Sequence, residues 1–183
     1  HYRGYQVLKC GPWTQGPYLL ESLRLLEGFN LSQMSFASVD YVHVVTEAMK
    51  LALAYRDEYY GDPLFTRVPL KALLSDQYTR IRRPLIDMQR ASLEVRPGDP
   101  YGMRPLKKPW SPSNAPGGTT VMCAADRWGN VIAATPSGLS STAGAAGDTG
   151  IIHGTRLTSL NSWKGHPNCI APGKRPRVTL TPT

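Results

Sequence analysis

The sequence has few charged residues and few cysteines for its length, and it has no long hydrophobic run. Charged residues make up 19% of its 183 residues, where about a quarter is usual. Cys10, Cys123 and Cys169 are far apart and form no C-x-x-C pair, so they support neither a disulfide framework nor a metal site. No run of about 18 apolar residues is present, so we expect no membrane span.

The start of the chain also lacks two usual features. It begins at His1 without a methionine, and no charged-then-apolar leader follows. We therefore expect a piece of a longer protein, about the size of one domain or a large part of one.

The net charge of +8 raises the question of an anionic partner. The basic residues are scattered, with short clusters at 80–83, 104–108 and 174–177, and neither a zinc-finger spacing nor an arginine-rich arm is present. We interpret this as a basic surface and expect no nucleic-acid partner. A basic nucleic-acid binder remains a distant alternative, which a salt-dependent shift on DNA would revive.

Glycine and proline are abundant, with 17 and 16 residues respectively. Six prolines and four glycines fall within residues 96–118. This composition predicts an exposed, mobile linker. Such a segment either joins two domains or is loose because it is cut.

The first third of the sequence has helical spacing. Apolar residues at 19–29 form one stripe, with Gly28 as a stop signal. Ser38 can cap a second helix that should end near residue 60, before the breaker cluster at 61–63. Shorter helices are expected over 69–75 and 76–82, the last ending before Pro84.

After residue 118 the pattern changes to that of strands. Residues 119–126 and 131–135 predict a hairpin around a turn at 127–130, and Cys123 is expected as a small core residue. A four-residue turn pairs Asp126 with Val131, which places Thr119 opposite position 137 or 138. The hydroxyl of Ser137 can then reach that of Thr119. Further strands are expected over 153–160 and 177–180.

The junction between the linker and this hairpin reads Gly117-Gly118-Thr119-Thr120. A threonine hydroxyl is a poor nucleophile unless a base lies beside it, and the α-amine of an N-terminal threonine can be that base. Such a mechanism requires cleavage between Gly118 and Thr119, and a glycine carbonyl is open to attack. The same four residues also occur as an ordinary turn before a strand.

Several longer motifs decide between these two interpretations. They are residues 47–57 (EAMKLALAYRD), Gly61-Asp62-Pro63, Thr119-Thr120, residues 126–130 (DRWGN), and residues 171–176 (APGKRP) leading into 181–183 (TPT). With these motifs in this order, the chain resembles the γ-glutamyltranspeptidase family of N-terminal-nucleophile hydrolases over nearly its whole length.

The resemblance implies a fold and an activity. The fold is α+β, part of a four-layer αββα sandwich, and the protein is made as an inactive precursor. Residues 1–95 would form the end of the large subunit, 96–118 the linker, and 119–183 the start of the small subunit, with the subunits paired after cleavage. Thr119 would be the nucleophile in autocleavage after Gly118 and in catalysis. The substrate would be a small-molecule amide, γ-glutamyl or similar, with no cofactor, and a periplasmic or secreted location is compatible.

The resemblance also assigns site residues. Ser137 occupies the position of a family threonine that hydrogen-bonds the nucleophile. Thr179 lies where the second of two family serines contacts substrate. Asn161 and Trp163 lie in the segment whose acidic residue holds the substrate's amino group, and Trp163 either lines the acyl pocket or belongs to the core.

The chain departs from the family pattern at the positions that recognise substrate. Val121 replaces a histidine, Leu139 replaces an asparagine, and residues 178–179 replace two serines. Residues 160–164 carry no carboxylate. Losing the groups that pair with a charged headgroup should exclude that headgroup strongly. We therefore expect an acyl group other than γ-glutamyl, or a catalytically silent member that serves as a binding or structural protein.

The remaining polar candidates have simpler interpretations. His43, on a predicted helix, is expected to be an ordinary surface or core histidine. His153 and His166 have no carboxylate or cysteine at metal-ligand spacing, so we expect no metal site. Glu47 and Asp57 are expected to pair with Arg or Lys rather than with each other as acid and base.

Overall fold

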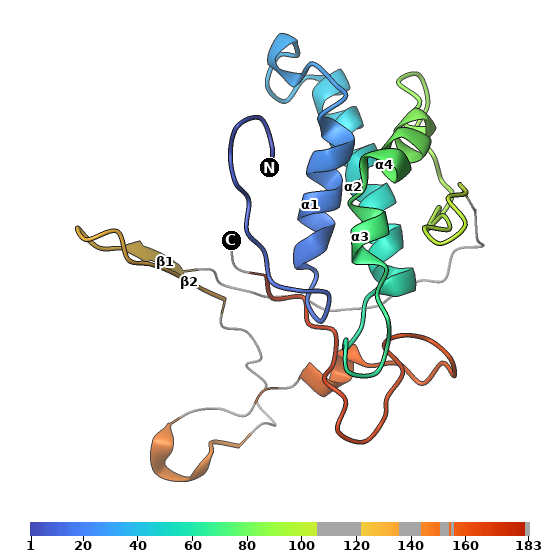
Figure 1. The fold of residues 1–183 in the computed structure, drawn as a ribbon. Coiled ribbons are helices and arrows are strands. Elements are labelled where there is room, and N and C mark those ends of the chain that lie inside the picture. The colour runs from blue at the N-terminus through green and yellow to red at the C-terminus, as the bar shows by residue number, and fades with distance from the viewer. Residues whose placement is uncertain (106–121, 136–143, 151–153, 155, 182–183) are drawn as a thin grey trace.

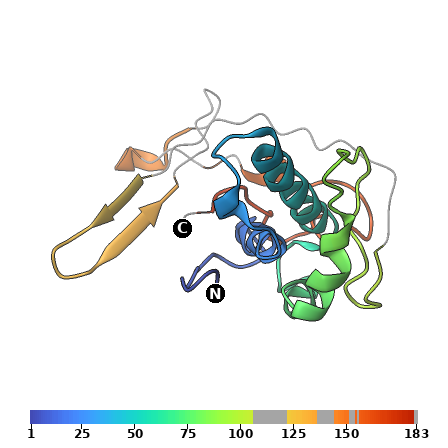
Figure 2. The same ribbon diagram turned by 90° about the horizontal axis from the view of Figure 1, so that it is seen from above.

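The computed structural model describes residues 1–105, 122–135, 144–150, 154 and 156–181. It mixes helix and sheet, as the α+β expectation requires. A helical body is wrapped at one end by the C-terminal segment, and a hairpin projects away from that body in both ribbon views (Figures 1 and 2). None of the helices in the described ranges is long and apolar enough to cross a membrane.

Two long helices form the body. They are α1 (Gly16–Leu26) and α2 (Val39–Tyr59), which lie side by side in Figure 1. The predicted start of α2 is confirmed, because the Ser38 hydroxyl accepts a hydrogen bond from Tyr41 N at 3.3 Å. Six buried residues form the core between these helices and the segment around residue 86: Leu25, Leu26, Val44, Ala48, Leu51 and Ile86.

The first helix differs from its predicted range. It begins at Gly16, three residues earlier than the apolar stripe, and it ends at Leu26. Pro17 explains the early start, because proline is preorganised for the first turn of a helix and loses no hydrogen bond there.

Two short helices follow, α3 (Leu70–Leu73) and α4 (Asp76–Arg82). The bounds of α4 are those predicted, and Ser75 caps it by accepting a bond from Tyr78 N at 3.2 Å. The described residues also include four short 3₁₀ helices: η1 (Leu31–Gln33), η2 (Arg83–Leu85), η3 (Gly147–Thr149) and η4 (Arg156–Ser159). A second buried cluster joins α2, α3 and α4: Ala52, Tyr55, Tyr60, Leu73 and Tyr78.

The start of the predicted linker is packed, which corrects the expectation of exposure there. Arg96 is 5% exposed, and its guanidinium donates to Glu47 Oε2 at 2.8 Å and to the carbonyl of Leu85 at 2.6 Å. Glu47 is itself buried on α2 and also pairs with Lys50. A buried carboxylate requires partners, and composition gave no sign that Arg96 supplies one. Residues 106–118 lie outside the described ranges.

The hairpin consists of β1 (Met122–Ala125) and β2 (Val131–Ala134), paired antiparallel. Its register differs by one residue from the four-residue-turn estimate, since Val131 pairs with Ala125 rather than with Asp126. The reason is the Asp126 carboxylate, which accepts bonds from the main-chain N of Trp128 and of Asn130, both at 2.9 Å, and so belongs to the turn.

Three further strand-based expectations are wrong. Cys123 is exposed rather than buried, because the described residues place no second layer against this two-stranded sheet. Within the predicted strand 153–160, Arg156–Ser159 is a 3₁₀ helix. Residues 177–180 form a single bridge, Val178 with Thr14, because α1 begins two residues after Thr14 and ends the extended stretch there.

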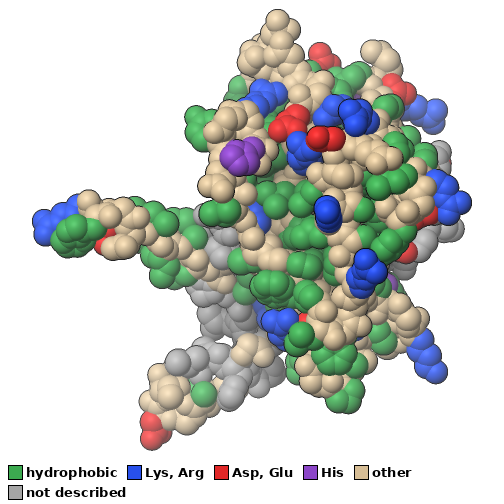
Figure 3. All heavy atoms as spheres, viewed as in Figure 1, with side chains coloured by type: hydrophobic (Ala, Val, Ile, Leu, Met, Phe, Trp, Pro, Cys, Tyr) green, Lys and Arg blue, Asp and Glu red, His purple; other side chains and the backbone are tan. Residues whose placement is uncertain are grey.

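The basic residues do not gather into one patch on the face seen in Figure 3, where Lys and Arg side chains are separated by apolar and uncharged surface.

Loss of the Glu47–Arg96 pair should destabilise the helical body. We expect Arg96→Ala to lower the free energy of unfolding of the full-length protein by about 3 kcal/mol, because it leaves a buried carboxylate short of a partner. Arg104→Ala is the matched control, since Arg104 pairs with Asp99 at the surface and should change stability little. Urea unfolding measures both, and equal effects would contradict the assignment.

Candidate substrate-binding segment

The sequence-predicted site residues fall into two groups. Gly118, Thr119 and Ser137 lie outside the described residues. Thr179, Asn161 and Trp163 are described, and all three belong to the C-terminal segment, residues 156–181. This segment wraps the end of α2 and the start of α1 (Figure 1).

A buried carboxylate attaches the C-terminal segment to the helical body. Asp62 is fully buried just after α2, and Arg175 donates to it through main-chain N at 2.9 Å, Nε at 3.1 Å and Nη2 at 2.8 Å. Leu64 N adds a fourth bond at 3.1 Å. The hydrogen bonds from the Arg175 side chain hold the pKa of Asp62 far below its ordinary value, although burial opposes them.

A second attachment lies at the last turn of α2. The Arg177 guanidinium donates to the carbonyl of Arg56 at 2.6 Å and lies 3.4 Å from the carboxylate of Asp57. Burial is the main cause that lowers the pKa of Arg177 to about 10, which still leaves it charged at neutral pH. Asp57 also pairs with Arg56. The expected ion pairing of Asp57 is therefore confirmed, as is that of Glu47.

The main chain at Thr179 is fixed by a residue that the sequence did not single out. Gln15, just before α1, donates from Nε2 to the Thr179 carbonyl at 2.8 Å and accepts from Arg56 Nη1 at 2.7 Å. Val178 N donates to the carbonyl of Trp13 at 2.9 Å. The position of Thr179 is thus set jointly by α1 and α2.

Asn161 shapes the turn that precedes these attachments. Its main-chain N donates to the carbonyl of Asn168 at 3.1 Å, and its carbonyl accepts from Ile170 N at 2.8 Å. Its side chain accepts from Trp163 N at 3.1 Å and contacts His166 Nδ1 at 2.9 Å. Both ends of the Asn161 amide are therefore engaged within the segment.

Trp163 lies at the rim of this turn. Its side chain is 50% exposed, and its ring meets that of His166 edge-on at 5.5 Å between centroids. A half-exposed ring is not a core residue, so of the two roles expected for Trp163 the core role does not fit.

The buried residue that organises the turn is Asn168, which the sequence analysis missed. It is 1% exposed, it accepts from Arg177 N at 2.9 Å, and it donates from Nδ2 to the carbonyl of Ser159 at 2.5 Å. The adjacent His166-Pro167-Asn168 triplet is the one signal that could have drawn attention to it.

The main chain of Gly61, just after α2, lies very close to the main chain of Pro167 in the C-terminal segment. A Cβ on Gly61 would lie 2.4 Å from the carbonyl oxygen of Pro167, so only glycine fits between α2 and this turn.

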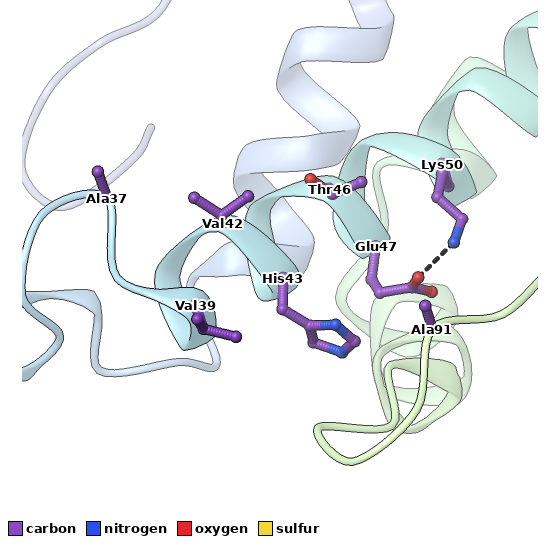
Figure 4. Close-up of a pocket in the computed structure, with 8 residues that line it drawn as sticks. All are labelled: Ala37, Val39, Val42, His43, Thr46, Glu47, Lys50 and Ala91. Atoms are coloured by element: carbon purple, nitrogen blue, oxygen red, sulfur yellow. Dashed lines mark hydrogen bonds and ion pairs between the residues drawn. The ribbon is translucent and has the colours of Figure 1, made fainter.

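A separate hollow of about 440 Å³ lies along the N-terminal half of α2, and Figure 4 shows the residues that line it. His43 lines this hollow and bonds the carbonyl of Asp87 at 2.8 Å, while Glu47 and Lys50 close one end. Of the predicted site residues that the structure describes, Asn161, Trp163 and Thr179, none lines it. Across the described ranges, no group of three or more His, Cys, Asp or Glu side chains could hold a metal ion.

Comparison with known proteins identifies relatives of the whole chain. The family described as gamma-glutamyltranspeptidase matches residues 1–183. The chain is 36% identical over 190 residues to the glutathione hydrolase proenzyme of Bacillus subtilis subsp. natto, covering 100% of this chain and 32% of that protein. It is 32% identical over 187 residues to the acylase ACY 1 proenzyme of Pseudomonas sp. (strain SE83), covering 99% of this chain and 31% of that protein.

A solved structure gives the same picture. The cephalosporin acylase from Bacillus halodurans superposes with a TM-score of 0.76 at 29% identity, covering 99% of this chain and 30% of that one. The chain therefore spans about a third of the length of the curated relatives it matches.

The Asp62–Arg175 attachment gives a prediction about acid. The pKa of Asp62 is lower in the folded protein than in the unfolded chain, so its stabilising contribution is complete above the unfolded value of about 4 and is lost as pH falls through the lowered value. Asp62→Asn should speed hydrogen exchange of residues 171–178 about tenfold at neutral pH.

Exchange mass spectrometry of the full-length protein measures this effect, with Asp99→Asn as the control, because the Asp99 carboxylate pairs with Arg104 rather than with the C-terminal segment. Below about pH 4 the wild type should approach the variant. A difference between wild type and variant that persists unchanged in acid would show that the carboxylate charge is not what holds the segment.

Proposed function

Because this chain belongs to the γ-glutamyltranspeptidase family, we propose that the full-length protein is an autoprocessing N-terminal-nucleophile hydrolase or acyltransferase. The match over residues 1–183 carries this proposal. Two relatives of the whole chain are named proenzymes, one a glutathione hydrolase and the other an acylase. Both names support synthesis as a precursor and amide chemistry.

The proposed nucleophile is Thr119. In maturation its Oγ attacks the carbonyl carbon of Gly118, the C–N bond between the two residues breaks, and the amine receives the proton. Water then hydrolyses the resulting ester, which leaves a carboxylate on Gly118 and a free hydroxyl and α-amine on Thr119. The new α-amine has an ordinary pKa of about 7.7–8.0, so it can serve as the base in later turnovers.

In turnover the same hydroxyl attacks the amide carbonyl of the substrate. The amine leaves with a proton, and the acyl group remains as an ester on Thr119. Water or a second amine then takes the acyl group. The bond changes in this sequence use only the threonine hydroxyl, its α-amine, water and the substrates, so the proposal invokes no cofactor.

The observed hairpin register supports a role for Ser137. Met122 pairs with Ala134, and the same antiparallel register continued by three pairs would join position 119 with position 137. The hydroxyl of Ser137 would then lie within reach of the Thr119 hydroxyl and could orient it.

The proposed acyl group lacks a free α-amino group. Residues 160–164 offer no carboxylate to bind one, and both ends of the Asn161 amide are engaged within the segment. The relatives named acylases are compatible with such a group. Thr179 and Trp163 remain the proposed contacts to the substrate.

The division into subunits and the four-layer sandwich are part of the same proposal. The exposed fractions of Val131 (80%) and Ile132 (63%) suit a hairpin that joins further strands and layers in the full-length protein. Residues 1–95 would end the large subunit, and residues 119–183 would begin the small one. The Asp62–Arg175 and Arg56–Arg177 contacts would then hold the two subunits together after cleavage.

Intact-mass spectra of the full-length protein test the nucleophile. The wild type should give two fragments divided between Gly118 and Thr119, and Thr119→Ala should give one intact chain. Thr120→Ala is the matched control and should still divide at the same bond. An intact wild type after prolonged incubation would favour the alternative, a silent family member that binds or supports a partner.

Ser137 gives a second, graded test. Ser137→Ala should slow maturation about 10- to 100-fold, because it removes a hydrogen bond that orients the nucleophile. Ser137→Thr keeps the hydroxyl and should mature at nearly the wild-type rate. Equal rates for the alanine variant and the wild type would remove Ser137 from the proposed site.

A further inference from the structure

One imidazole ties together the turn that carries Asn161 and Trp163. His166 Nε2 lies 2.8 Å from the carbonyl of Asp57, in the last turn of α2. His166 Nδ1 lies 3.0 Å from the main-chain N of Asn168 and 2.9 Å from Asn161 Nδ2. The ring therefore joins α2 to two points of the C-terminal segment.

Its partners fix a single protonation state. The N–H of Asn168 can only donate, so Nδ1 must accept and must carry no proton. The Asp57 carbonyl can only accept, so Nε2 must carry the proton. The Asn161 amide is oriented independently, because its oxygen accepts from Trp163 N, which turns its NH₂ group toward Nδ1. The network is complete only with a neutral, Nε2-protonated ring.

The charges around the ring favour this state on balance. Burial is the largest cause that lowers the pKa of His166, and the Arg177 guanidinium adds to it. The bond to the Asp57 carbonyl and the carboxylates of Glu58 and Asp57 act in the opposite direction. Three further groups that contact the ring are uncharged: the main-chain N–H of Asn168, the Asn161 amide and the edge-on Trp163 ring.

Resting on the proposed function, we propose that His166 is a positioning residue, whose neutral imidazole orients Asn161 and the 161–163 turn for substrate. A proton on Nδ1 would face two donors and break both contacts at once. The turn cannot adjust by moving toward α2, because Gly61 already approaches Pro167 too closely for any side chain. Protonation of His166 would therefore displace the 161–163 turn and weaken the binding of substrate.

The sign of the pH dependence follows. The pKa of His166 is lower in the folded protein than in the unfolded chain. The stabilising contribution of the neutral ring is therefore complete above the unfolded value of about 6.5 and is lost as pH falls through the lowered, native value. KM should therefore rise in mild acid.

Two variants separate the two ring nitrogens. His166→Asn places an amide oxygen near the position of Nδ1 and keeps the acceptor. His166→Gln places its amide near Nε2 and loses that acceptor. In full-length protein with p-nitroanilide amides as probes, His166→Gln should raise KM at least tenfold, with a smaller change in kcat, because Asn168 N and Asn161 Nδ2 both lose their acceptor and each lost bond costs about 1 kcal/mol or more. His166→Asn should recover most of that loss and show no rise of KM in mild acid.

Trypsin gives a readout that does not need activity. In the uncleaved Thr119→Ala protein, His166→Gln should speed cutting after the exposed Lys164 about tenfold, and His166→Asn should not. Equal effects of the two variants, or a rise of KM in acid that persists in His166→Asn, would overturn the proposal. If the wild type neither matures nor turns over, the proposed function fails, and the trypsin comparison alone supports or overturns the role of His166.

Discussion

Burial of the Asp62 carboxylate is the constraint on which the rest of the described structure depends. A fully buried charge is tolerated only when it is paired and hydrogen-bonded, and Arg175 supplies three of the four bonds that satisfy it. That requirement brings a residue 113 positions away to the end of α2. Once Arg175 is fixed, the neighbouring Arg177 reaches Asp57, and the residues that follow reach Trp13 and Gln15 at the start of α1.

Local signals predicted those parts of the fold whose causes are local. Ser38 and Ser75 cap α2 and α4 with their own hydroxyls, so these helices begin where expected. The predicted register of the hairpin differs from the observed register by one residue, because the Asp126 carboxylate accepts hydrogen bonds from main-chain N–H groups of the turn. The prediction that the start of the linker is exposed was wrong because a long-range contact buries it. Glycine and proline content cannot show that Glu47, 49 positions earlier, pairs with Arg96.

The candidate site divides in the same way. Motifs and resemblance suggested Thr119, Ser137 and Thr179, and these remain predictions about chemistry. The residues that hold the site were harder to find, because Gln15 and His166 act on partners 164 and 109 positions away. His166 has no partner at metal-ligand spacing in the sequence, and its two ring nitrogens instead join separate parts of the chain. Asp57 and Glu47 were predicted as ion-pair residues because carboxylates on a helix usually find a cation.

The long sequence separation of Asp62 and Arg175 determines how their contact responds to dilution of the protein once the chain has been cut. In an unbroken chain the intervening residues keep the two groups at a high effective concentration, and breakage of the pair is followed by rapid re-formation. A cut anywhere between residues 62 and 175 removes that tether and makes the same contact an encounter between two molecules. From then on its lifetime is set by its own dissociation rate, so a four-bond, buried carboxylate suits a junction that must persist without covalent support.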